Sequence, residues 1–263
     1  MITLQHLVKS FPAPRPKRQG FLQKLTQPRE RIFAVNDISF TCRPGRIFSL
    51  VGPNGAGKTT TLRILATMLK PESGIVTVNG YDSALHEKSV RGQIGFLTGT
   101  TGLYERLTPD ELLRYFARLY GIDSNTFKHR SQELYHLLGI HGFKNKKIGE
   151  LSSGMKQKVS ICRTMIHDPA VVIFDEPTAG LDVITAKHII ELIKDCKKKN
   201  KTVLFSTHIM SEVELLSDDI AMIHNGYLIF NDTMEQFRRE MDQENITEEF
   251  IYRINQVETE TLA

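Results

Sequence analysis

A glycine-rich segment that ends in a lysine and two threonines limits most strongly what this chain can fold into. It occupies residues 52–60, reads GPNGAGKTT, and satisfies the pattern G-x-x-x-x-G-K-[ST] in full. An apolar stretch at 45–52 precedes it, and residues 58–70 follow with apolar side chains at helical spacing. Where a strand turns into a helix in this way, successive backbone N–H groups form an anion nest at the positive helix end. The segment therefore predicts a site for a nucleoside triphosphate.

Each residue type in this loop has a physical task. Glycine adopts backbone conformations closed to other residues, which lets the amides approach the phosphates. Lys58 supplies a mobile cation for the β and γ phosphates, and the Thr59 hydroxyl is a hard oxygen ligand for Mg²⁺. The predicted nucleotide-binding residues of the loop are Gly52, Pro53, Asn54, Gly55, Ala56, Gly57, Lys58, Thr59 and Thr60.

A second segment, 171–182 (VVIFDEPTAGLD), ends an apolar run with two acids. A buried parallel strand would carry these acids out at its carboxyl end, where such sheets bind ligands. Asp175 can hold Mg²⁺ directly or through water. Glu176 is expected to point to the opposite side and to polarise an attacking water. Two acids can also simply terminate a strand, but beside the glycine loop they indicate phosphate chemistry.

A third segment, 150–169, opens a predicted helix with Ser152 and Ser153, which can cap it, and with Gly154, which clears space above its first amides. This helix end is a second anion site on the same chain. A single triphosphate does not need two separate helix N-termini unless the second comes from another copy of the chain.

Strand and helix patterns alternate along the chain, which predicts an α/β fold with a mostly parallel sheet and helices on its faces. The expected strands are 2–8, 33–40, 45–52, 74–80, 92–99, 170–176 and 202–207, and an Asn-Gly turn at 225–226 indicates a hairpin. The expected helices are 58–70, 108–121, about 125–138, 153–167, 183–198, 209–217 and a closing helix beyond 243 with Ile246, Phe250, Ile251 and Ile254 on its docked face.

Composition excludes several classes of protein. The 263 residues are 40% apolar and carry a net charge of +4, which suits a folded soluble chain rather than a dense nucleic-acid binder. No window approaches about 18 consecutive apolar residues, and the N-terminus lacks the layout of a signal peptide. The three cysteines, Cys42, Cys162 and Cys196, have no metal-ligand spacing and are interpreted as small buried groups.

Taken jointly, GPNGAGKTT, LSSGMKQK, VVIFDEPTAGLD and FSTH resemble, in that order, the ATP-binding subunits of ABC transporters, over about residues 2–240. The segments LATMLKPESGIVTVNGYD and VRGQIGFLTGTTGLYERLTP are similar to the branch of the family that includes sodium-efflux and drug-efflux ATPases. The resemblance implies a P-loop NTPase fold with a mostly parallel core sheet, an antiparallel β subdomain and a helical insert that carries the signature motif. It also implies Mg²⁺ and ATP as cofactors, and a head-to-tail dimer with two ATPs between the subunits.

The resemblance assigns further roles. Ser152, Ser153 and Gly154 would face the γ-phosphate held by the other subunit, and Glu176 matches the catalytic base. The remaining assignments are His208 as the switch histidine, Asp182 in the loop 179–182 that couples the two sites, Phe11 against adenine, and Val35 as padding of the same pocket.

Two positions depart from the family pattern. Gly99 stands where the family has a glutamine that contributes an oxygen to Mg²⁺ and senses the membrane subunit. The signature has Ser153 in place of glycine and Met155 in place of glutamine. Water can replace a lost Mg²⁺ ligand, so we expect ATP binding to survive and hydrolysis to be slow or differently coupled.

Residues 12–31 form a basic, proline-rich insertion that should interrupt the strand pattern and lie at the surface. One interpretation is a solvated loop. The alternative is contact with anionic lipid headgroups or with the permease through Arg15, Lys17, Arg18 and Lys24.

The predicted function is an ATPase (ATP and water to ADP and phosphate) that powers export through a separate membrane permease, from the cytoplasmic face of the membrane. Its partners would be the permease and a second copy of itself, and no nucleic acid. The alternatives are a soluble ABC ATPase that remodels ribosomes or DNA, and a slow-hydrolysing nucleotide-sensing module. The predicted organisation is one ATPase domain at 1–243, with a helical subdomain at about 101–165, and a C-terminal helix and polar tail at 244–263. The transported substance is outside what the sequence encodes.

Overall fold

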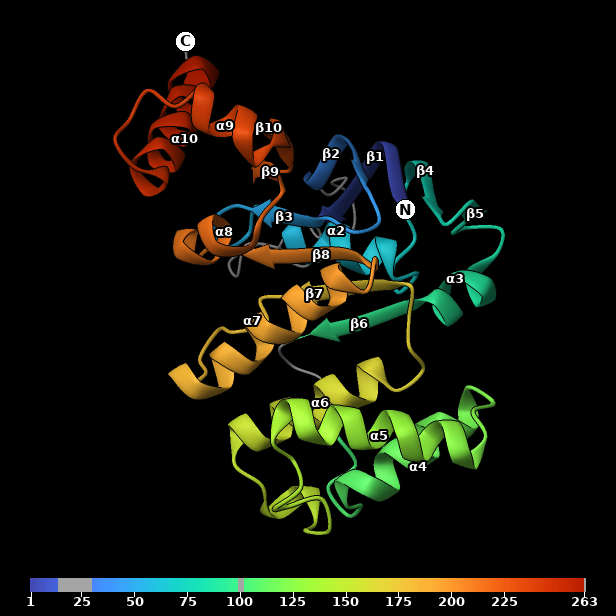
Figure 1. Cartoon of the computed structure of the whole chain (residues 1–263). Helices are drawn as coiled ribbons and strands as arrows, with labels where there is room; N and C mark the ends of the chain where they lie inside the picture. The colour runs from blue at the N-terminus through green and yellow to red at the C-terminus, as the bar shows by residue number, and fades with distance from the viewer. Residues whose placement is uncertain (14–29, 99–101, 263) are drawn as a thin grey trace, which may run out of the picture.

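The structure, a computed structural model, describes residues 1–13, 30–98 and 102–262 and contains two β-sheets (Figure 1). Most of the basic insertion and Gly99 lie outside the described residues, so the predictions made for them stay predictions. No helix of the described residues is both long enough and apolar enough to cross a membrane.

The larger sheet has six strands in the order β10-β9-β3-β8-β7-β6. Five of them run parallel, and β10 pairs antiparallel with β9 at one edge. Their bounds are β3 Ile47–Val51, β6 Ile94–Thr98, β7 Val171–Asp175, β8 Thr202–Thr207, β9 Asp219–His224 and β10 Tyr227–Thr233. Strands β3, β7 and β8 are buried along their whole length, as expected of a parallel sheet covered on both faces. The predicted mostly parallel core sheet is confirmed.

The smaller sheet is antiparallel, in the order β2-β1-β4-β5, and confirms the expected antiparallel subdomain. Its strands are β1 Ile2–Pro12, β2 Arg31–Cys42, β4 Ser73–Val78 and β5 Tyr81–Asp82. Strands β1 and β2 are longer than predicted, because Pro12 still pairs with Arg31 and Ala13 N donates to Glu30 O at 2.8 Å. Proline is tolerated here because the pair lies at the end of the ladder.

Some helices pack on the six-stranded sheet, and the others form a separate group. Between β6 and β7 the chain builds a helical insert, which lies below the sheet in Figure 1. The insert contains α4 Pro109–Leu119, α5 Ser124–Leu138, the short 3-10 helix η1 Ile148–Glu150 and α6 Ser153–Met165. The other helices are α2 Lys58–Leu65, α3 Glu87–Gln93, α7 Val183–Lys198, α8 Met210–Leu216, α9 Met234–Arg239 and α10 Ile246–Leu262.

Alternate residues of the buried strands enter two different cores. Val172 and Phe174 of β7 pack with α7 and the helical insert, whereas Val171 and Ile173 pack with α2 and the antiparallel sheet. This alternation follows from the two-residue period of a strand. The fold therefore fixes β3 and β7 between two apolar layers and leaves their carboxyl ends as the edge where polar groups can gather.

Local signals explain most helix boundaries. Thr108 and Glu111 form a capping box at the start of α4, with Pro109 in its first turn. The sequence did not predict β5, α3 or α9, which are all short. It also assigned Ile251 to the docked face of α10, which is wrong, because that side chain is 52% exposed. Ile246 and Phe250 do pack against the core.

Candidate functional site

The glycine-rich loop connects β3 to α2 and is packed tightly from behind. Gly57 caps α2 with φ at 111°, and a Cβ on it would lie 2.0 Å from the carbonyl oxygen of Ala34. A Cβ on Gly52 would lie 2.3 Å from the carbonyl oxygen of Ile223. Only glycine fits these positions, since any side chain would clash with backbone. Asn54 and Gly55, at the tip of the loop, are exposed.

Lys58 begins α2 and is 4% exposed. Its Nζ donates to the carbonyl oxygens of Gly52 at 2.7 Å and Pro53 at 3.0 Å, and lies 3.4 Å from Oε1 of Glu176. Burial lowers the pKa of Lys58, and the carboxylate of Glu176 opposes that shift. The loop therefore holds a mostly buried cation that its own carbonyls partly satisfy, next to the anion nest.

Asp175 ends β7 directly beside the loop. Its Oδ1 accepts hydrogen bonds from Oγ of Ser206 at 2.7 Å and from Oγ1 of Thr59 at 3.1 Å. One carboxylate and one hydroxyl suit Mg²⁺, which keeps most of its waters and takes few protein oxygens. Among the described residues no group of three or more His, Cys, Asp or Glu side chains could hold a metal. The donors present fit a magnesium ion shared with phosphate oxygens.

Glu176 follows β7 with φ at 48°, in the left-handed region. Its Oε1 lies 3.3 Å from Nδ1 of His208, in addition to the contact with Lys58. Strict strand alternation predicted that Glu176 would point away from Asp175, and that prediction is wrong. The left-handed backbone at 176 turns the side chain, so that the two acids reach the neighbouring residues Lys58 and Thr59.

Two buried polar groups that the sequence did not single out hold this edge together. The hydroxyl of Ser206, 0% exposed, donates to Asp175 and accepts from the Glu176 backbone N at 3.1 Å. Glu212 of α8 accepts from the hydroxyls of Thr178 and, at 2.8 Å, Thr207. A serine inside the apolar run TVLFST was a visible signal for the first group; nothing local indicated the second.

The start of α6 lies apart from the glycine-rich loop. Ser152 caps the helix by accepting from Met155 N at 3.3 Å, and both Ser152 and Ser153 are exposed. A Cβ on Gly154 would lie 3.2 Å from Oγ1 of Thr185, at the start of α7. Among the described residues, no hydrogen bond or ion pair joins residues 152–154 to the loop at 52–60. The start of α6 thus presents two exposed serines to the solvent.

Asp182 is the cap of α7. Its carboxylate accepts from Thr185 N at 3.0 Å and from Thr185 Oγ1 at 2.8 Å, and the backbone hydrogen bond is the main reason that its pKa is lowered. Two apolar residues follow it on the surface, Val183 at 87% exposed and Ile184 at 69%. Exposed apolar side chains next to a cap are suited to contact with another chain.

Phe11 and Val35, the two residues predicted for the adenine pocket, lie on neighbouring strands but differ in solvent exposure. Phe11 is 40% exposed near the end of β1, and Nζ of Lys9 lies 5.6 Å from its ring centroid. Val35 is 0% exposed and packs in the core between the two sheets. The prediction that Val35 pads the adenine pocket is therefore corrected, because Val35 has no surface available to the adenine ring.

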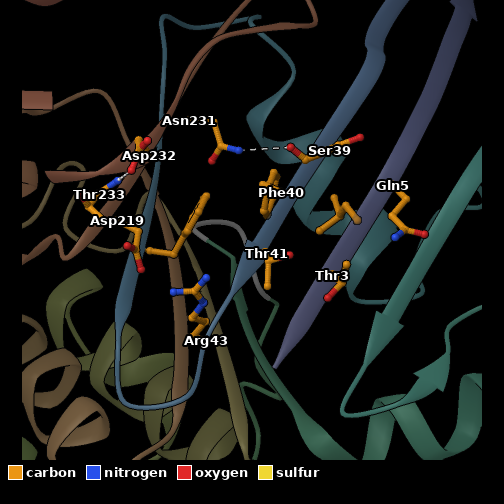
Figure 2. Close-up of a pocket in the computed structure, with 12 residues that line it drawn as sticks. Thr3, Gln5, Ser39, Phe40, Thr41, Arg43, Asp219, Asn231, Asp232 and Thr233 are labelled. Carbon is orange, nitrogen blue, oxygen red and sulfur yellow. Dashed lines mark hydrogen bonds between the residues drawn. The ribbon is translucent and has the colours of Figure 1, made fainter. Parts of the chain in front are cut away.

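Hollows elsewhere on the molecule are separate from this site. One of about 520 Å³ lies between β1 and β2 on one side and β9 and β10 on the other (Figure 2). Its Asp219 is already paired with Arg46, and none of its lining residues belongs to the glycine-rich loop. A second, of about 320 Å³, lies between the end of α2, β6 and helices α4 and α6. Phe96, Phe116 and Tyr120 line it, together with Arg91 and Arg163.

A phosphate loop at a helix start, with an aspartate at the carboxyl end of the strand two places away in a mostly parallel sheet, defines a P-loop NTPase. The comparisons with known proteins agree. The family model described as "ABC transporter" matches residues 35–179. The ABC transporter ATP-binding protein NatA of Bacillus subtilis is 40% identical over 88% of this chain and 95% of its own length.

Other relatives and solved structures point the same way. The bacitracin transport ATP-binding protein BcrA of Bacillus licheniformis is 36% identical over 74% of this chain and 63% of its own length. A structure described as the ATP-binding subunit of an ABC transporter superposes with a TM-score of 0.82 at 27% identity, over 96% of this chain and 99% of that one. The chain therefore belongs to the ABC transporter family, as an ATP-binding ATPase subunit.

Proposed function

We propose that this subunit binds MgATP on the glycine-rich loop and hydrolyses it when two copies close head to tail. The observation that carries the proposal is the gathering of five side chains at one sheet edge, while the start of α6 lies elsewhere on the surface. The five are Lys58, Thr59, Asp175, Glu176 and His208.

The loop would hold the triphosphate through its backbone amides at the positive end of α2. Lys58 would leave the carbonyl oxygens of Gly52 and Pro53 and turn to the β and γ phosphates. Because its charge is held in a mostly buried place, its attraction for phosphate is stronger than that of an exposed lysine. The ring of Phe11 would stack on the adenine.

A magnesium ion would be held by Thr59 and Asp175, whose oxygens already lie 3.1 Å apart. When bound, such an ion neutralises charge on the phosphate oxygens as a Lewis acid. Ser206 donates to the same carboxylate oxygen and so fixes its direction. Replacing Ser206 by alanine should therefore raise the Mg²⁺ concentration needed for half-maximal activity.

Glu176 would accept a hydrogen bond from the attacking water and orient it toward the γ-phosphate. His208, 3.3 Å from that carboxylate, would position it and contact the same phosphate. Lys58 and the backbone nest would stabilise the charge on the transferred group. This chain's residues thereby supply the position of the water and most of the electrostatic stabilisation.

The second half of each pocket would come from the partner copy. Ser152, Ser153 and Gly154 would face the γ-phosphate on the other subunit, and Asp182, with Val183 and Ile184, would lie in the contact between the copies. A structure of the cassette MJ0796, described as dimeric, is similar to this chain, with a TM-score of 0.74 and 25% identity over 89% of this chain and 99% of that one.

Mixing two inactive variants tests this arrangement. Lys58→Ala disables the phosphate loop, and Ser153→Glu places a negative charge at the exposed start of α6. In a head-to-tail pair, a mixed dimer has one pocket with both defects and one pocket with none. We expect each variant alone to be inactive. In an equal mixture, roughly a quarter of all pockets should be intact, and ATPase activity should return to roughly a quarter of the wild-type value. Absence of any gain on mixing would rule out shared pockets.

We propose that the permease docks in the hollow between β6, α4 and α6. Two exposed apolar residues line it, Met68 at 65% and Tyr120 at 44%, and Leu119, 63% exposed, directly precedes Tyr120 in the chain. Contiguous apolar surface of this kind is typical of protein interfaces. The double variant Met68→Ser/Leu119→Ser should keep the ATPase of the isolated subunit and lose co-purification with the permease. Ile75→Ser/Leu215→Ser, at exposed apolar positions elsewhere, is the matched control.

We infer that the direction of transport is export and that the subunit works on the cytoplasmic face of the membrane. The support is the set of relatives described as transport, resistance or export proteins, including the linearmycin resistance protein LnrL of Bacillus subtilis, 35% identical over 74% of this chain and 63% of its own length. Accumulation of substrate inside inside-out vesicles upon ATP addition tests the direction. No observation favours a ribosome, DNA or sensor role.

The basic insertion at 12–31 is proposed to contact anionic lipid headgroups beside the permease. Its support is charge alone, through Arg15, Lys17, Arg18 and Lys24. Replacing these four residues by glutamine should reduce sedimentation with vesicles containing phosphatidylserine, and should leave binding to neutral vesicles unchanged. Equal sedimentation of variant and wild type would show that the insertion does not bind anionic lipid headgroups.

A further inference from the structure

The turn between β9 and β10 supports the phosphate loop from behind. The backbone N of Gly226 donates to the carbonyl oxygen of Ala56 in the loop at 2.9 Å. The carbonyl oxygen of Ile223 lies so close to Gly52 that a Cβ there would come within 2.3 Å. Any movement of residues 223–226 is therefore transmitted directly to the loop that is proposed to hold the triphosphate.

Two contacts hold this turn in place. On one side Asn36 N of β2 donates to the carbonyl oxygen of Gly226 at 2.8 Å. On the other side His224, whose side chain is 9% exposed, has its Nε2 3.2 Å from Oε1 of Glu258 and 3.0 Å from Nδ2 of Asn225. Among the described carboxylates, Glu258 is the one within ion-pairing distance of His224.

Glu258 belongs to α10, near the end of the described chain, and α10 is firmly anchored by its first turns. Ile246 packs in the same core as Val51 of β3. Glu249, 0% exposed, accepts from the backbone N of Asp242 at 2.8 Å and pairs with Arg253 at 2.5 Å. The Arg253 guanidinium also lies over the rings of two phenylalanines. An anchored helix presents a side chain in its last turns at a fixed position.

We propose that Glu258 is a positioning residue for nucleotide binding. Through His224 it holds the β9–β10 turn against the phosphate loop and keeps the loop amides arranged before ATP arrives. Binding sites that are ordered in advance lose less entropy when the ligand binds, and so bind more tightly. The proposal rests on the phosphate-loop function proposed above and adds that the C-terminal helix tunes its affinity.

The test is equilibrium binding of the Mg²⁺ complex of the non-hydrolysable analogue AMP-PNP. Glu258→Ala should raise the Kd up to about fivefold, the upper range for one partly exposed ion pair. Because the Glu258 side chain is 54% exposed, the variant should fold normally. Hydrogen exchange of the peptides covering 52–60 and 222–228 should become faster, while exchange in the helical insert should not change. Glu248→Ala, which removes an exposed carboxylate from the first turn of the same helix, is the matched control and should leave the Kd unchanged.

A double-mutant cycle separates this role from a general loss of stability. If Glu258 acts through His224, the double variant Glu258→Ala/His224→Ala should bind no more weakly than His224→Ala alone. Should His224→Ala fail to fold, His224→Gln replaces it, and the comparison of Glu258→Ala with Glu248→Ala decides by itself. Equal Kd values for those two variants, or fully additive effects in the cycle, overturn the inference. Failure of the wild-type protein to bind the analogue would instead overturn the proposed function.

Discussion

The Oε1 atom of Glu176 lies 3.3 Å from Nδ1 of His208 and within 3.4 Å of Nζ of Lys58, so three segments of the chain meet at one carboxylate oxygen. Lys58 starts α2, Glu176 follows β7 and His208 follows β8. A carboxylate held at this point, beside the phosphate loop, can accept a proton from a water or orient it.

Glu176→Gln should abolish turnover and keep ATP binding. The amide retains the shape of the side chain but cannot accept a proton, so phosphate release should fall at least about 100-fold. With Mg-ATP present, uncleaved nucleotide should trap the paired form, which light scattering would detect as doubled mass. Glu214→Gln, at an exposed acid of α8, is the control. Wild-type activity in the Glu176 variant would refute the proposed role.

Gly57→Ala should lose nucleotide binding and stability together. A Cβ at this position would lie 2.0 Å from the carbonyl oxygen of Ala34, and φ at 111° is strained for alanine. We expect a loss of more than about 2 kcal/mol in the free energy of unfolding. Gly92→Ala is the contrast, because α3 leaves open space there, and alanine should be neutral or stabilising by up to about 1 kcal/mol. Urea unfolding of both variants measures the difference.

The stability of the protein should fall between pH 6.5 and 4 because of His167. This ring stacks on Tyr120 with centroids 4.0 Å apart, and burial lowers the pKa of His167 from 6.5 to about 4. In that range the unfolded chain binds a proton that the folded chain does not, so stability rises with pH, by about 3 kcal/mol in total. His167→Phe keeps a ring against Tyr120 and should flatten this part of the urea-midpoint profile. The exposed His129→Phe should not.

Gly99→Gln should leave ATP affinity intact. The residue lies outside the described part of the chain, so this prediction rests on the sequence pattern alone. Since Mg²⁺ accepts water as a ligand, a glutamine oxygen can be absent without loss of binding. Nucleotide titration of the variant measures the affinity, and a marked loss would show that the alignment of this segment with the family's glutamine is wrong.

The sequence predicted the elements whose signals are local. The bounds of α7 and β8 agree with prediction to the residue, because Asp182 caps the helix and Thr202–Thr207 is a run of apolar and β-branched residues with a single serine. Among short elements, α9 escaped prediction although Thr233 caps it, because six residues do not establish a period.

Parts of the site depend on contacts between residues that are far apart in the chain. These parts could not be predicted from the sequence. Strand period placed Glu176 on the wrong side, since a single left-handed residue reverses a side chain without any change in the pattern. The family resemblance assigned Val35 to the adenine pocket, but packing of the two sheets buries it. The bridge from Glu212 joins helix α8 to Thr178, in the turn after β7, and to Thr207 at the end of β8, and no short motif connects the three.

The distance between the start of α6 and the phosphate loop has a consequence for how such a protein can evolve. If each polypeptide contributes the front of one pocket and the back of the other, every substitution is duplicated, and both pockets change by the same amount. A pair made from one gene can therefore become faster or slower only as a whole. One strong pocket beside one weak pocket requires two genes whose products have diverged.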